Sequence, residues 1–97
     1  MDITRGCVVL STAGHDKGGL FYVLSIDETG YAFIIDGKTR KFEKPKRKKL
    51  KHLKFYTIET QSRIYEKIIN DNRPENAEIR KALGLLTKEV SEWQKTE

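Results

Sequence analysis

The stretch Gly6-Cys-Val-Val-Leu-Ser-Thr-Ala-Gly-His-Asp-Lys-Gly-Gly-Leu-Phe-Tyr-Val23 holds two runs of strand-forming residues around a loop with three glycines. Aliphatic β-branched and aromatic residues suit a pleated strand, whereas glycine tolerates the positive φ angles of a tight loop. Glycine, serine and aspartate bound the two runs, as is usual at strand ends. The pattern predicts strands over Gly6–Ser11 and Gly19–Asp27, joined by the glycine-rich loop.

Three further strands are expected downstream of this pair. Tyr31–Asp36 is apolar and is followed by Asp36-Gly37, a dipeptide typical of a hairpin turn. The hairpin predicts a fourth strand over Lys38–Phe42, which ends at Pro45 because proline has no N–H for a sheet ladder. Leu50–Ile58 reads as a fifth strand. The predicted fold class is mostly β with appended helices, the five strands forming a small closed barrel.

The second half of the chain changes to helical periodicity. Apolar residues predict a first helix over about residues 60–70, and Pro74 suits the first turn of a second helix that ends near Lys95. The second helix carries one apolar stripe. The stripe either packs on the first helix or the barrel, or forms a coiled-coil dimer, or serves as a partner surface. Its residues are Ile79, Leu83, Leu86, Val90 and Trp93. We expect a barrel domain over residues 1–57 and a helical extension over residues 58–97.

The bulk composition narrows the class of protein. Ninety-seven residues with 37% hydrophobic and 34% charged residues are typical of a small, highly charged globular chain. No apolar run approaches the length of a membrane span, and none near the N-terminus reaches that of a signal peptide. The single cysteine, Cys7, excludes an internal disulfide and fits a reducing compartment. We expect a cytoplasmic protein in which Cys7 is a small buried residue.

Positive charge is concentrated in one segment. Ten of the nineteen Lys and Arg residues lie between Lys38 and Lys54, where Glu43 is the only acid, so the segment has a net charge of +9. The remaining residues carry nine bases and thirteen acids, a net charge of −4. A block of this density repels itself and attracts a polyanion, of which the phosphate backbone of a nucleic acid is the commonest.

The segment from Gly6 to Val23 resembles a KOW motif, which is a strand, a glycine-centred loop and a second strand. In this motif Gly14 and Gly18 would adopt positive φ angles. Asp16 would accept backbone N–H bonds within the turn, and Lys17 would stand at the loop tip.

The order of the glycine loop, Asp36-Gly37 and the basic run Lys44–Leu53 is similar to that of KOW-containing large-subunit ribosomal proteins of archaeal and eukaryotic type and their small bacterial relatives. The resemblance covers about Thr4 to Tyr56. It implies a five-stranded SH3-like barrel that binds RNA, either as a ribosomal protein or as a dissociable ribosome-associated or assembly factor in translation. It implies nothing about residues 58–97.

The candidate RNA-binding residues follow from the charge and the resemblance. Arg40 and Lys41 are expected on opposite faces of the fourth strand, and Lys46–Lys49 in the loop before the fifth. Such a ridge on a rigid body would contact phosphates and recognise the shape of an RNA more than its sequence. The candidates are Lys17, Arg40, Lys41, Lys44, Lys46, Arg47, Lys48, Lys49, Lys51, His52 and Lys54. Five aromatic residues either stack on an unpaired base or, in most cases, fill the core, namely Tyr22, Tyr31, Phe42, Phe55 and Tyr56.

Two other functions compete with RNA binding. The chain can be a protein-interaction module that binds a transcription or translation factor through the apolar stripe of the second helix. The run Pro45–Lys49 also fits a nuclear localisation signal, and a solvated loop without a partner is the plainest alternative.

No catalytic set is evident. The spacing of His15, His52 and Cys7 fits neither a zinc nor a haem site, and the glycine loop lacks the Gly-Lys-Ser/Thr ending of a nucleotide-binding loop. We therefore expect no enzymatic activity, no cofactor, no metal, no small-molecule substrate and no membrane partner. The expected partner is ribosomal RNA, with ribosomal proteins as further partners.

Overall fold

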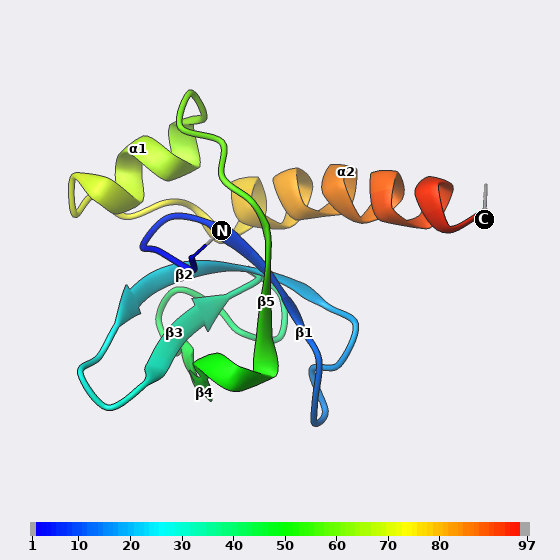
Figure 1. Ribbon diagram of the computed structural model, residues 1–97. Coiled ribbons are helices and arrows are strands. Elements are labelled where there is room, and N and C mark those ends of the chain that lie inside the picture. The colour runs from blue at the N-terminus through cyan, green and yellow to red at the C-terminus, as the bar shows by residue number, and fades with distance from the viewer. Residues whose placement is uncertain (1, 96–97) are drawn as a thin grey trace.

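The computed structural model describes residues 2–95, with side chains for residues 2–89. It contains a five-stranded antiparallel sheet followed by two helices (Figure 1). The elements are β1 (Val8–Ser11), β2 (Leu20–Ile26), β3 (Tyr31–Ile35), β4 (Lys46–Lys49), the 3₁₀ turn η1 (Leu50–His52), β5 (Leu53–Thr57), α1 (Arg63–Ile69) and α2 (Asn76–Lys95). No helix in the described part of the chain is long and apolar enough to cross a membrane.

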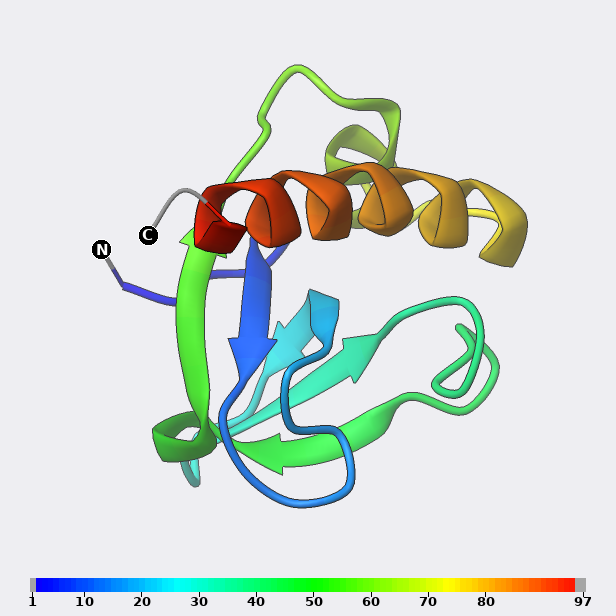
Figure 2. The same ribbon diagram turned by 90° about the vertical axis from the view of Figure 1, so that its right-hand side faces the viewer.

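The strand order is β4-β3-β2-β1-β5, so β1 pairs with both β2 and β5. Register shifts between Val8 and Val9 and between Val23 and Ser25 mark irregularities that bend the strands. The sheet is strongly curved, with β4 and β5 at its two edges (Figure 2). The predicted closed barrel is therefore not formed by the ladders within residues 2–95, since no β4–β5 pairing completes the ring.

The predicted fourth strand over Lys38–Phe42 is wrong, and the predicted loop over Lys46–Lys49 is β4. The Asp36 carboxylate accepts the backbone N–H groups of Lys38 (2.9 Å) and Arg40 (2.7 Å), which closes a local turn. These hydrogen bonds hold the chain in a turn after β3 and leave β4 to pair with β3 further along. Pro45 precedes β4 and does not end a strand.

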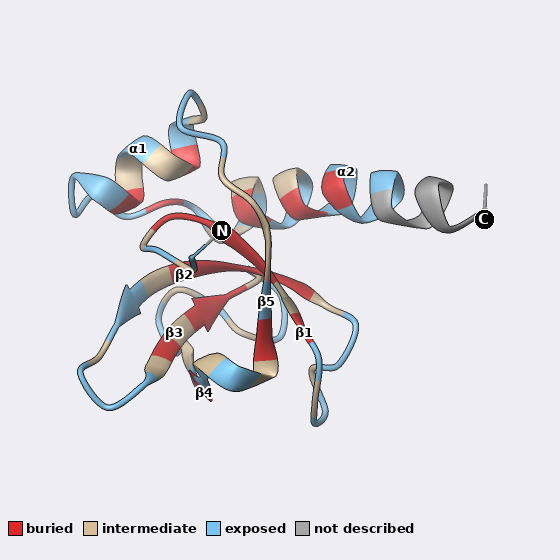
Figure 3. Ribbon diagram, in the orientation of Figure 1, coloured by how far each residue is buried: buried red, intermediate tan, exposed pale blue. Residues whose placement is uncertain are grey.

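The two faces of the sheet carry separate apolar clusters. Buried residues lie along the strands and on both helices (Figure 3). The helices cover one face, where α1 and α2 contribute five of the nine buried residues. That cluster consists of Val8, Leu20, Tyr22, Ile35, Ile64, Ile68, Ile79, Leu83 and Leu86. The concave face encloses Cys7, Val9, Phe21, Val23, Ala32, Ile34 and Leu53. The sheet and the two helices therefore form one core together, and the second core contains no described residue of the helices.

Both helices begin with a side chain that satisfies an otherwise unpaired N–H group. The Ser62 hydroxyl accepts the N–H of Tyr65 (3.1 Å) at the start of α1. The Glu78 carboxylate accepts the N–H of Glu75 (2.8 Å) at the start of α2. These caps fix both helix starts close to the predicted positions, with Pro74 just before α2.

The apolar stripe of α2 packs on the sheet, as expected if it belongs to the core and not to a coiled-coil dimer. Ile79, Leu83 and Leu86 are buried in the helix-covered core, so they offer no exposed partner surface. Val90 and Trp93 lie outside the described side chains.

The start of α2 also holds the connection between β3 and β4. The Arg80 guanidinium donates to the Gly37 carbonyl (2.7 Å), and the Asn76 side-chain oxygen accepts the N–H of Phe42 (2.9 Å). Gly37 has a φ of 75°, and a Cβ atom there would lie 2.4 Å from the Asn76 carbonyl oxygen. The close approach requires glycine, and it fixes the first half of the basic segment against the helix.

Candidate nucleic-acid interface

The register of β4 against β3 divides its basic side chains between two faces. Ala32 pairs with Lys48 and Ile34 with Lys46, so these two lysines share the concave face with buried residues. Arg47 pairs with Phe33, and Lys49 with Tyr31, so these four residues share the opposite face. A strand made entirely of basic residues is possible here because β4 is an edge strand, where lysine is common.

Lys48 points inward and meets the glycine loop between β1 and β2. Its side chain is only 9% exposed, and Nζ donates to the Ala13 carbonyl (2.6 Å) and lies 3.8 Å from Asp16 Oδ2. Arg40 donates two hydrogen bonds to the Asp16 carboxylate (3.3 and 3.2 Å). Two of the predicted RNA contacts thus hold Asp16 inside the molecule.

The glycine loop itself was predicted only in part. Gly14 and Gly18 have φ angles of 75° and 89°, as expected, and Lys17 is exposed. The expectation for Asp16 is wrong, because its carboxylate accepts the side chain of Arg40 and no backbone N–H of the described residues. Backbone hydrogen bonds such as Lys17 N–H to the Gly14 carbonyl (3.2 Å) close the loop, and the Asp16 carboxylate anchors it to the basic segment.

Arg47 is the third basic residue of the Lys38–Lys54 segment that has an acidic partner. Its Nε donates to Asp27 Oδ2 (3.2 Å), and its guanidinium carbon lies 3.6 Å from the centre of the Tyr31 ring. Hydrogen bonds to the Asp27 carboxylate, foremost from the Thr29 hydroxyl, lower the pKa of Asp27, and the bond from Arg47 adds to the effect.

The other seven bases of the segment have no ion-pair partner within residues 2–89. Six of them are exposed and Lys46 is half-buried. They are Lys38, Lys41, Lys44, Lys46, Lys49, Lys51 and Lys54. Glu43, the only acid of the segment, faces α2 instead. Its pKa is lowered first by its own backbone N–H and next by the Asn76 amide, with the Arg73 charge contributing less.

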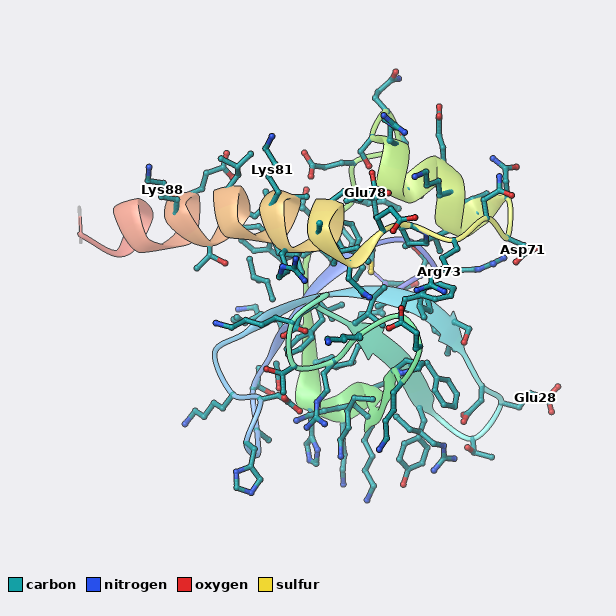
Figure 4. The ribbon with its side chains drawn as sticks, turned by 180° about the vertical axis from the view of Figure 1, so that it is seen from behind. Glu28, Asp71, Arg73, Glu78, Lys81 and Lys88 are labelled. Atoms are coloured by element: carbon teal, nitrogen blue, oxygen red, sulfur yellow. The ribbon has the colours of Figure 1, made fainter. Side chains whose placement is uncertain are left out.

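We call residues 46–54, which form β4, η1 and β5, the basic edge. It carries six Lys and Arg residues, one histidine and no acid. It lies at the end of the sheet opposite the helices, whereas Lys81 and Lys88 project from α2 on the far side (Figure 4). Lys51 and His52 sit in η1, and Lys54 follows in β5. The exposed basic residues of this segment therefore stand on regular, hydrogen-bonded backbone.

Most of the candidate stacking aromatics belong to the cores. Tyr22 is buried, and burial first and the Glu59 charge second raise its pKa to about 12. Phe42 and Tyr56 pack on the helix-covered core, and Phe55 packs on the concave one. Tyr31 is the exception, since it lies beneath Arg47. Phe33, which alternates with Tyr31 along the strand, is half-buried on the same face and was not singled out from the sequence.

The described histidine, cysteine and acidic side chains that could act in catalysis or bind a metal do not come together in one site. No cluster of three or more His, Cys, Asp or Glu side chains suited to a metal occurs in the described part of the chain. Cys7 is buried, which raises the pKa of its thiol and keeps the reactive thiolate scarce. His15 is an exposed loop residue. The surface feature with a clear chemical preference is the basic edge.

Comparison with protein-family models gives no match for this chain. Comparison with curated proteins likewise gives no match.

Proposed function

We propose that the protein binds RNA through the basic edge and the exposed lysines beside it, and that ribosomal RNA is its target in translation or ribosome assembly. The observation that carries this proposal is the row of lysines that have no acidic partner among the described side chains, although the same fold pairs Arg40, Arg47 and Lys48 with acids. Uncompensated charge of this density destabilises a folded protein by self-repulsion. Its retention on a rigid edge favours a polyanionic partner.

The rigidity of the edge favours folded RNA over a flexible polyanion. Lys49 and Lys51 lie on β4 and η1, whose backbone is held by the ladder to β3 and by the Leu50 N–H bond to the Gly30 carbonyl (2.9 Å). Because the backbone is already ordered, only the side-chain freedom of these lysines is lost when they meet phosphates in a matching arrangement. Phosphate contacts of this kind position the protein and recognise shape.

The KOW resemblance is part of the proposal. Its support is the positive φ of Gly14 and Gly18 and the pairing of β1 with both β2 and β5, which brings the first and last strands together as in a barrel-like fold. The five curved strands would then be a variant of the SH3-like barrel in which the β4 and β5 edges stay unpaired.

The proposal is tested by sedimentation of cell lysate through sucrose gradients at low and high salt, with the protein detected by blotting. Three forms are compared, namely the wild type, Lys49→Gln/Lys51→Gln, and the control Lys81→Gln/Lys88→Gln, which removes the same charge from α2. We expect the wild type and the control to sediment with large ribosomal subunits at low salt and the edge variant to leave them at lower salt. Wild type that sediments only as free protein at both salts would refute the ribosomal target.

A further inference from the structure

We propose that the stacked Tyr31–Arg47 pair is a binding site for an unpaired nucleobase, so that the RNA bound by this protein has a single-stranded segment at the contact. The inference rests on the proposed RNA-binding function and names the kind of RNA that it takes. The argument begins from the geometry of Arg47, the one residue of the basic edge that is both fixed in place and half exposed.

Three contacts fix the position and orientation of the Arg47 guanidinium. Its carbon lies 3.6 Å from the centre of the Tyr31 ring, Nε donates to Asp27 (3.2 Å), and a terminal nitrogen donates to the Thr29 hydroxyl (3.1 Å). The side chain nevertheless remains 48% exposed. One face of the planar cation is therefore on the tyrosine ring, and the side chain still presents surface to solvent.

The group that fixes Arg47 is itself fixed. Asp27 Oδ1 accepts the N–H of Thr29 (2.9 Å), the hydroxyl of Thr29 (2.8 Å) and the N–H of Tyr31 (3.1 Å). These bonds shape the turn between β2 and β3 and leave Oδ2 for Arg47. The guanidinium is thus oriented before any ligand arrives, which lowers the entropic cost of binding.

A planar guanidinium on an aromatic ring is well suited to a nucleobase. Arginine stacks on flat π systems through its delocalised plane, and unpaired bases of RNA stack on aromatic rings and on arginine planes. The interior of a duplex offers no such base face, because its bases are stacked on one another, and only its two terminal pairs are open. The site therefore discriminates unpaired from paired RNA.

The surroundings supply the remaining parts of a nucleotide site. Lys49 is directly opposite Tyr31 in the ladder and is exposed, so it can contact a phosphate next to the stacked base. Phe33, opposite Arg47, extends the half-exposed aromatic surface on the same face. Both helices lie over the far part of the sheet and leave this end uncovered (Figures 1 and 2).

The test compares two RNA probes, a hairpin with an unpaired loop and a blunt duplex with the stem sequence. Arg47→Lys keeps the charge and removes the plane. We expect it to weaken hairpin binding by about fivefold to a hundredfold, the range measured for loss of one base stack, and to leave duplex binding unchanged. Unchanged binding to both probes would overturn the inference, because Arg47 would then act only as a charge. Equal weakening on both probes would overturn it as well, because the guanidinium would then contact a group that the duplex also has.

A second pair of variants protects the test against misfolding. Tyr31→Phe keeps the ring and should behave as wild type, whereas Tyr31→Val removes the ring with a residue that still favours strands and should resemble Arg47→Lys. Thermal melting of each variant establishes that it is folded. Lys49→Gln/Lys51→Gln should weaken both probes. If the wild type binds neither probe, the proposed RNA-binding function is wrong. If it binds both probes equally, only the proposed stacking site is wrong.

Discussion

On the helical side of the molecule, residues 58–97 carry seven bases and eight acids, whereas the basic edge carries six Lys and Arg residues and no acid. The helical side balances its positive and negative charges and pairs some of them. Lys67 donates to Glu78 (2.6 Å), Arg5 meets Asp71, and Arg73 meets Glu43 across the contact between α2 and the β3–β4 connection. On the basic edge, only Arg47 and Lys48 have acidic partners among the described side chains.

The difference separates charges used for folding from charges left for a partner. Exposed ion pairs contribute little, at most about 1 kcal/mol each, so the pairs of the helical side mainly orient neighbouring segments. The inward pair Lys48–Asp16 is more important to the fold because both side chains are 9% exposed. The other lysines of the basic edge make no side-chain hydrogen bond or ion pair with the described residues. Four predictions, ordered by expected effect, test this division.

The first prediction concerns the contact that joins the two regions. Gly37→Ala should lower the free energy of unfolding by about 3 kcal/mol, because a positive φ disfavours alanine and the new Cβ would clash with the Asn76 carbonyl oxygen. Urea unfolding measures the loss. Gly30→Ala is the matched control, since Gly30 also has a positive φ but no atom within 4 Å of a Cβ. An equal loss in both variants would contradict the docking of the connection on α2.

The second prediction tests whether the inward charges belong to the fold. Asp16→Asn should lower the free energy of unfolding by about 2 kcal/mol, because Lys48 would keep a buried charge without its acid. Lys48→Met added to Asp16→Asn should recover part of the loss, since the methionine carries no charge into the same space. Urea unfolding of the three proteins measures the coupling. No recovery in the double variant would show that the two side chains act independently.

The third prediction concerns pH on the helix-covered face. The folded protein keeps the Tyr22 proton up to a pKa of about 12, whereas the unfolded chain releases it near 10. Stability from this group is therefore complete below pH 10 and falls as the pH rises toward 12, by roughly 2 kcal/mol. Tyr22→Phe should remove this decline and cost little at neutral pH, because the hydroxyl has no hydrogen-bond partner among the described residues. Identical alkaline unfolding of both proteins would disprove the shift.

The sequence predicts most of the fold where local pattern and tertiary structure agree. β1, β2, β3 and both helices lie close to where strand runs and helical periodicity place them. The predicted fifth strand is confirmed only from Leu53, because Leu50–His52 form a 3₁₀ turn. The main local error falls on the basic segment, where Lys38–Phe42 was expected to be a strand, and the expected closure of the barrel is also missing from the ladders of the described residues. A hairpin signal cannot reveal that Asn76, far along the chain, accepts the N–H of Phe42, nor that an all-basic tetrapeptide is stable as an edge strand.

The candidate site was predictable as a charged segment but not residue by residue. Composition identifies the lysines, yet the roles of Arg40 and Lys48 depend on Asp16, which the fold brings to them from the loop between β1 and β2. The stacking of Arg47 on Tyr31 depends on the strand register, which residue spacing alone did not fix. Alternation along Tyr31–Ile35 was the only available signal for Phe33.

The fourth prediction tests the central claim most directly, through the affinity for a ribosomal RNA fragment measured by filter binding over a series of salt concentrations. The logarithm of the binding constant should fall linearly with the logarithm of salt concentration. Lys49→Gln/Lys51→Gln should bind more weakly than wild type, with a slope smaller by about 1.4 to 1.8, since each lost phosphate contact removes 0.7 to 0.9. Lys81→Gln/Lys88→Gln should keep the wild-type slope. The same slope in both double variants would contradict the assignment of RNA binding to the basic edge.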